Sequence, residues 1–190
     1  GARVNRKSSR IEVARCKIRS GYGVTIGSEV SAGVSDVYIH DIDFFQSDCG
    51  IRMKSSKERG GVIENIRVEN LNMIDVQFPF SWIMDWHNEY NRKNSNDLAQ
   101  MPESWQAVAE EIPESKQMTK VKDIHIKNVQ ACLSPGYSLP SRAFDLVAFP
   151  EKPIEDVCFS HCQITAKEFG RIEAVQNLCF KSCDLSIETG

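Results

Sequence analysis

The sequence lacks the short patterns by which many enzymes are recognised. It contains no GxSxG, HExxH, GKS or GKT pattern, and none of its seven cysteines forms a CxxC pair. No apolar run approaches the roughly 20 residues that a membrane-spanning helix needs. The formal net charge is only -3, so neither a nucleic acid nor an anionic membrane is expected as a partner. The length of 190 residues suits one domain with a sizeable core.

One pattern returns six times along the chain: an apolar residue, any residue, an apolar residue, two usually polar residues, and then an apolar residue or cysteine. Each copy alternates with period two, which predicts a strand. The copies begin at positions 11, 37, 66, 124, 157 and 178, so the gaps are 26, 29, 58, 33 and 21, and 58 is twice 29. Such a period, with no helical pattern between most copies, predicts a solenoid of stacked β-coils.

A second family of strands is expected midway between these copies. Residues 23–26 and 50–53 lie 27 residues apart, at equivalent positions in successive repeats. Residues 143–146 and 170–173 look like later members of the same family of strands. At least two strands per coil favours an all-β, right-handed parallel β-helix, with residues 1–190 forming a single segment of it. A leucine-rich horseshoe is less suitable because its LxxLxLxxN signature is missing, and a β-sandwich is the remaining alternative.

One stretch, near residues 75–120, lacks the repeated strand pattern. It predicts an excursion from the β-helix that consists of helix and loop. It contains all three tryptophans, Trp82, Trp86 and Trp105. Residues 102–111 have the pattern of a short helix, with Pro102 near its first turn. Excursions from a rigid scaffold often carry binding residues.

Four cysteines allow two interpretations. Cys158 and Cys162 are four residues apart, as are Cys179 and Cys183, which could be read as a zinc site. In a β-helix, however, Cys162 and Cys183 would share one core column in consecutive coils, and Cys158 and Cys179 another. We therefore expect stacked cysteines that behave as small hydrophobic residues, with no bound metal and no cofactor.

Two cations mark a candidate binding site. Arg52 and Lys54 alternate with Ile51 and Met53, so period two places both cations side by side on the face opposite the core. Together they can bind a carboxylate, because the Arg guanidinium can donate two parallel hydrogen bonds to it and the Lys ammonium adds a point charge. The alternative is that both are ordinary solvated surface residues.

The neighbouring coil adds detail to this site. When residues 23–27 are aligned with residues 50–54 of the next coil, Arg52 stacks over Thr25 and Lys54 over Gly27. We therefore expect Gly27, which has no side chain, to leave open space beside Lys54. Tyr22, from the Gly-Tyr-Gly step, is expected near the same patch. The result would be a small polar pocket on one face of the β-helix.

These motifs, in order, resemble the bacterial polygalacturonases, which belong to family 28 of the glycoside hydrolases. In that family the first element is Gly-His-Gly and the second is Arg-Ile-Lys. The resemblance rests on residues 21–29, 33–34, 50–55, 59–66, 86–90, 121–126 and 153 onward. It implies a pectin-directed hydrolase in which Arg52, Lys54 and Tyr22 bind the substrate, with the two cations on a carboxylate that is normally galacturonate's. Tyr22 stands where most members have His.

The same resemblance implies that this chain carries no catalytic residue. The family's three catalytic aspartates lie in an Asn-Thr-Asp and an Asp-Asp motif upstream of Gly-His-Gly, and neither motif is present. Members resemble inverting glycosidases, which need two carboxyl groups roughly 6.5–9.5 Å apart. We expect the polypeptide alone to be inactive. The alternative is a non-catalytic β-helix module that binds acidic polysaccharide. The family further implies a secreted or periplasmic location.

The first ten residues are too polar to cover the exposed edge of the first coil. They contain only Val4 as a sizeable aliphatic residue, so they cannot cover the apolar rung at residues 11–13. Solenoids need elements that cap their open ends. We therefore expect this edge to be covered by missing N-terminal coils or by another chain.

Overall fold

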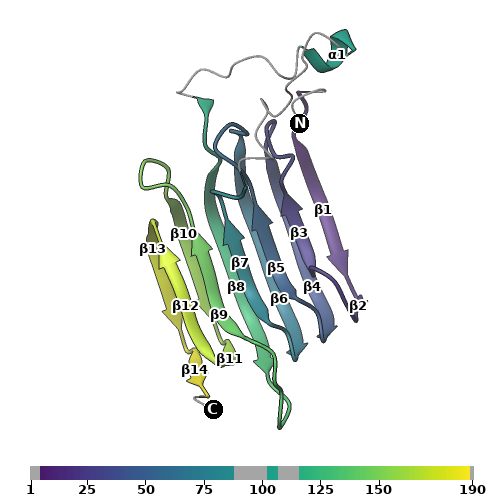
Figure 1. Ribbon diagram of the computed structural model, residues 1–190, viewed down its shortest axis with the longest axis vertical. Helices are drawn as coiled ribbons and strands as arrows, with labels where there is room; N and C mark the ends of the chain where they lie inside the picture. Colours follow the sequence, from purple (N-terminus) through teal and green to yellow (C-terminus); the bar gives the residue numbers. More distant parts are fainter. Residues whose placement is uncertain (1–4, 88–101, 107–115, 189–190) are drawn as a thin grey trace.

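Parallel strands make up most of the chain. The structure, a computed structural model, describes residues 5–87, 102–106 and 116–188 (Figure 1). The described strands are β1 (Ser8–Ala14), β2 (Lys17–Ile18), β3 (Val24–Gly27), β4 (Val34–Phe45), β5 (Cys49–Lys54), β6 (Val62–Ile74), β7 (Phe78–Ile83), β8 (Lys120–Cys132), β9 (Arg142–Val147), β10 (Ile154–Ser160), β11 (Gln163–Ala166), β12 (Glu168–Glu173), β13 (Val175–Lys181) and β14 (Asp184–Ile187). A short helix, α1, spans Glu103–Gln106.

The first sheet contains the six strands of the repeat. Its order is β1-β4-β6-β8-β10-β13, and every neighbouring pair is parallel. The first residue of each copy pairs with the first residue of the next: Ile11, Val37, Ile66, Ile124, Val157 and Leu178 form one column. Both the strands and the register are as the sequence predicts, and the fold is a right-handed parallel β-helix.

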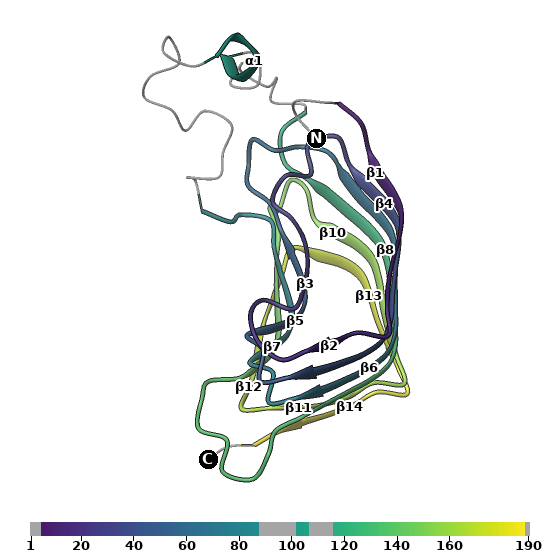
Figure 2. The ribbon, with the colours of Figure 1, turned by 90° about the vertical axis from the view of Figure 1, so that its right-hand side faces the viewer.

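The second sheet has the order β12-β9-β7-β5-β3 and forms the opposite wall of the coils (Figure 2). Val24 pairs with Ile51, and Phe144 pairs with Gly170, so the four strands expected midway between the copies are all present. β7 corrects the predicted start of the excursion. Phe78–Ile83 is a regular member of this sheet, and its Trp82 is fully buried in the core.

The excursion therefore begins after β7 rather than at residue 75. The helix predicted over residues 102–111 is observed as α1 at Glu103–Gln106, and residues 107–111 lie outside the described part of the chain. Among the described residues, no helix is long and apolar enough to cross a membrane.

Left-handed backbone at polar residues produces the bend within the long strands. Asp41, Asn70 and Asn128 have φ of 54°, a region that Asp and Asn tolerate better than most residues. They stack in consecutive coils, because the side chain of Asn128 donates to Asn70 at 2.7 Å and that of Asn70 donates to Asp41 at 2.9 Å. The residue at which each coil turns a corner is thus one of the two usually polar positions of the repeat.

The core lies between the two sheets and contains a cluster of aromatic rings. Phe159 is fully buried and lies 5.0 Å from Phe80, 5.3 Å from Phe144 and 6.1 Å from Trp82, measured between ring centroids. These rings come from both walls, β10 on one side and β7 and β9 on the other. The cluster therefore joins the two sheets across the coil.

The cysteines stack in the predicted pairs, but only Cys162 and Cys183 belong to the core, so the expectation that Cys158 and Cys179 are core residues is wrong. Cys158 pairs with Cys179 in the sheet, while Cys162 is fully buried and Cys183, in the next coil, packs against the core. Because Cys158 alternates with the buried Val157 and Phe159, it faces outward. The two pairs thus lie on different faces of the sheet, which does not suit a tetrahedral zinc site. Within the described ranges, no group of three or more His, Cys, Asp or Glu residues is placed to hold a metal.

Candidate functional site

The two cations of β5 lie on the outer face of the second sheet, as predicted. Ile51 and Met53 are fully buried in the core, and the side chains between and after them point the other way. Arg52 pairs with Thr25 and Lys54 pairs with Gly27 in the neighbouring strand β3. Period-two alternation therefore places both cations on one surface.

Arg52 contacts two aromatic rings. Its guanidinium carbon lies 4.7 Å from the centroid of Tyr22 and 4.5 Å from that of Trp86. Lys54 also approaches Trp86, with Nζ 5.6 Å from the ring centroid. Although Arg52 faces away from the core it is only 7% exposed, whereas Tyr22 is 60% exposed. The structure thus brings together Arg52, Lys54 and Tyr22, and adds Trp86.

Trp86 is the site residue that sequence reasoning missed. It falls within the excursion and within one of the segments that resemble polygalacturonases, but no pattern in the sequence assigned it to the cations. Its position is set by the backbone, since its N–H donates to the carbonyl of Ser55 at 2.8 Å. Ser55 follows β5 directly, so Trp86 is fixed beside the strand that carries both cations.

Hydrogen bonds to the backbone of its turn hold Tyr22 in place. The hydroxyl of Thr25 donates to the carbonyl of Tyr22 at 3.0 Å, and the N–H of Asp48 donates to the carbonyl of Gly21 at 2.8 Å. The turn that carries Tyr22 is therefore tied both to β3 and to the turn before β5. A guanidinium in contact with two anchored rings loses little freedom when it binds a ligand.

Gly27 does not leave open space beside Lys54, and that expectation is wrong. A Cβ atom on Gly27 would collide with the carbonyl oxygen of Lys54, and φ of Gly27 is +112°. Gly27 thus lets β3 approach β5 closely in a conformation that other residues rarely adopt. The surface beside Lys54 is formed by Trp86, not by a gap at Gly27.

Charges around the site favour the binding of an anion. The pKa of Lys54 is lowered, first by burial and then by the positive charge of Arg52, while Glu29 raises it. Glu29 itself forms an ion pair with Arg59. Two cations on one surface, one of them largely desolvated, are stabilised by a carboxylate that approaches both.

A row of polar residues extends beyond the two cations. Across the second sheet, the residues in register with Arg52 are Thr25 in β3, Ser81 in β7, Asp145 in β9 and Arg171 in β12. The last two form an ion pair, with Arg171 Nε 2.5 Å from Asp145 Oδ1. The row follows the stacking direction of the coils, and within it Ser81 and Asp145 are only 6% and 7% exposed.

A comparison with known families decides where this chain belongs. The family model "Glycosyl hydrolases family 28" matches residues 2–179. The chain is a member of glycosyl hydrolases family 28. The probable polygalacturonase of Vitis vinifera is 37% identical to this family 28 chain over 57 residues, which is 30% of the chain and 12% of the relative. The polygalacturonase of Ralstonia solanacearum is 36% identical over 63 residues, covering 31% and 12%.

Solved structures agree on the fold. A hyperthermoactive exopolygalacturonase from Thermotoga maritima superposes with a TM-score of 0.68 at 18% identity over 97% of this family 28 chain and 36% of that protein. A family 28 exopolygalacturonase from Yersinia enterocolitica gives 0.55 at 16% identity over 91% and 30%. This chain therefore spans about a third of the length of these structures, and its match covers 12% of each curated relative named above.

Proposed function

We propose that this chain is the C-terminal part of a pectin-directed glycoside hydrolase and that it binds the carboxylate of a galacturonate unit. The guanidinium of Arg52, in contact with Tyr22 and Trp86 and with Lys54 on the same face, carries this proposal. The two rings contact the guanidinium without accepting its N–H groups as a carboxylate would, so the group keeps donors for a ligand. A planar carboxylate matches the geometry of those donors.

The hydrolytic carboxyl groups are proposed to come from outside this chain. Two acids on the side of the second sheet that carries the proposed site are engaged by arginines: Glu29 pairs with Arg59, and Asp145 with Arg171. Two further carboxylates, Asp36 and Asp41, accept hydrogen bonds from the corner residues Asn65 and Asn70. An inverting hydrolase needs one acid to protonate the leaving oxygen and one base to activate water.

Hydrolysis of homogalacturonan tests this proposal. The complete protein, with its upstream coils, is expected to release reducing ends, and the 190-residue chain alone is expected to release none. Proton NMR of the first products should show the anomeric configuration inverted relative to the substrate. A complete protein that binds oligogalacturonate without cleaving it would support instead a non-catalytic module for acidic polysaccharide. Under the hydrolase proposal, the protein acts in a secreted or periplasmic location, where pectic polymers are encountered.

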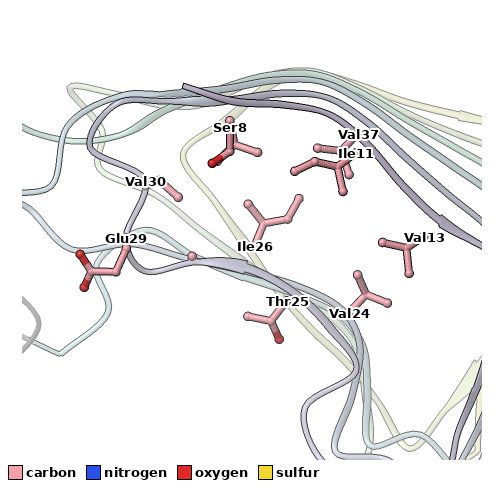
Figure 3. A pocket seen from close by; sticks show the side chains of 11 residues that line it. Ser8, Ile11, Val13, Val24, Thr25, Ile26, Glu29, Val30 and Val37 are labelled. Atoms are coloured by element: carbon pink, nitrogen blue, oxygen red, sulfur yellow. The ribbon is translucent and has the colours of Figure 1, made fainter. Parts of the chain in front are cut away.

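The end of the solenoid formed by β1 and β3 is the second feature with a functional consequence. A cavity of about 250 Å³ opens there between the two walls, and it is lined by core-facing side chains, among them Ile11, Val13, Val24 and Ile26 (Figure 3). Ile11 is 38% exposed, whereas its column neighbours Val37 and Ile66 are almost fully buried. We propose that further N-terminal coils of the same fold stack on this end, because the family relatives are about three times longer than this chain.

The open end gives a prediction about association. The 190-residue chain alone is expected to form dimers or larger species, since β1 presents unpaired backbone groups beside exposed apolar side chains. A form extended by upstream coils should be monomeric under the same conditions. Multi-angle light scattering distinguishes the two, and a monodisperse 21.5 kDa monomer of the short chain would contradict the proposal.

A further inference from the structure

Two cysteines of the last coils lie directly opposite each other on the outer face of the first sheet. Cys158 of β10 and Cys179 of β13 are partners in the parallel ladder, and their Sγ atoms are 2.9 Å apart. Adjacent strands are spaced by about 4.8 Å, which falls within the Cα separation that disulfides accept. We propose that Cys158 and Cys179 form a reversible disulfide when the protein meets a low-molecular-weight disulfide such as oxidised glutathione.

The chemistry is thiol–disulfide exchange in two steps. One cysteine loses its proton to solvent, and its thiolate attacks a sulfur of oxidised glutathione, forming a mixed disulfide and releasing one glutathione thiolate. The second cysteine, likewise deprotonated, attacks the protein sulfur of that mixed disulfide and releases the second glutathione thiolate. The two protein thiols are oxidised to one disulfide, and one oxidised glutathione is reduced to two thiols.

The surroundings favour this pair over the other cysteines of the same coils. Cys158 and Cys179 are partly exposed, so a small disulfide can reach them. Cys162, by contrast, is fully buried. Its Sγ donates to the carbonyl of Ser160 at 3.4 Å, and the Sγ of its neighbour Cys183 donates to the carbonyl of Lys181 at 3.4 Å. Cys183 is as partly exposed as Cys158 and Cys179, but a bond to it would have to include Cys162, which small disulfides in solvent cannot reach.

The position of β13 explains why such a bond would be reversible. β13 is the last strand of the first sheet's order and pairs there with β10 alone, so it can shift to let the sulfurs bond. Parallel neighbours hold Cβ atoms farther apart than an unstrained disulfide prefers, and strained disulfides are more easily reduced. The bond would tie down a coil whose apolar side chains are poorly covered: Phe180 is 47% exposed and Ile187 39%.

Peptide mapping tests the proposal on the complete protein. The protein is incubated with oxidised glutathione at mildly alkaline pH, because burial and the contact with Cys179 raise the pKa of Cys158. Remaining thiols are alkylated, and the protein is digested with trypsin without reduction. Cleavage after Lys167, Arg171 and Lys181 separates Cys179 from Cys183. We expect peptide 143–167 linked to peptide 172–181, with the link lost after treatment with dithiothreitol.

Variants assign the link to particular residues. Cys158→Ser and Cys179→Ser should each abolish it, whereas Cys16→Ser, at an exposed cysteine of the first coil, should leave it unchanged. Cross-linked protein should also show slower proteolysis after Lys181 than the reduced form. The proposal is overturned if Cys158 and Cys179 are recovered alkylated or separately glutathionylated, or if peptide 143–167 is linked instead to the peptide that begins at Ser182.

Discussion

Replacing Arg52 by Gln should weaken the binding of oligogalacturonate to the complete protein by about ten- to a hundredfold. A charge-assisted hydrogen bond to a carboxylate contributes about 1.5–3 kcal/mol, and each 1.4 kcal/mol changes the dissociation constant tenfold. Gln keeps a polar planar group beside Tyr22 and Trp86 but removes the charge and the second donor prong. Isothermal titration calorimetry of both proteins with the same oligomer measures the change.

Arg142→Gln provides the matched control. Arg142, the first residue of β9, is another partly exposed cation of the second sheet, and its guanidinium carbon lies 5.3 Å from the ring centroid of Phe78. It pairs with Glu168 in β12 and makes none of the contacts that define the proposed site. Its replacement should change the dissociation constant less than twofold. Equal losses in the two variants would mean that general surface charge, rather than the Arg52 site, attracts the ligand.

Replacing Phe159 by Ala should lower the free energy of unfolding by about 3–5 kcal/mol. Phe159 is fully buried and contacts rings from both walls of the coil, so its removal leaves a cavity that the surrounding strands cannot close. Urea unfolding followed by tryptophan fluorescence reports the loss, because Trp82 stacks on Phe159 with ring centroids 6.1 Å apart.

Phe45→Ala is the control for this substitution. Phe45 ends β4 and is 39% exposed, so its truncation should cost no more than about 0.5 kcal/mol. A loss at Phe159 as small as that at Phe45 would show that the two sheets are not held together by the aromatic cluster. A solenoid unfolds coil by coil when its repeats are weakly coupled, so a single cooperative transition should first be established for the wild-type protein.

The sequence predicted the first sheet in detail because each coil repeats the same chemistry. Apolar residues at Val37, Ile66 and Ile124 must all face the core, and a slip by one residue would turn them outward, so the register follows from the pattern. The left-handed corners at Asp41 and Asn70 occupy the polar positions of the same repeat. The alternation around Arg52 placed the two cations on the outer face for the same reason.

Other features escaped prediction because they depend on contacts between distant segments. β7 was hidden because Pro79 and four large residues in its six positions blur the alternation that marked the other strands. Trp86 lies 34 residues after Arg52 and reaches it only because one coil stacks on another. The role of Gly27 depends on how closely β3 approaches the carbonyl of Lys54, which no single-strand pattern reveals.

The most direct test of the central claim is a set of calorimetric titrations that removes the carboxylate from the ligand or the two cations from the protein. The complete protein is titrated with oligogalacturonate and with a neutral oligogalactose of equal length, and the Arg52→Ala, Lys54→Ala double variant is titrated with the acidic oligomer. We predict that the wild-type protein binds the acidic oligomer, that it binds the neutral one at least about tenfold more weakly, and that the double variant loses most of its affinity. Equal affinity of the wild-type protein for both oligomers, with no loss in the double variant, would contradict the assignment of Arg52 and Lys54 as the carboxylate-binding pair.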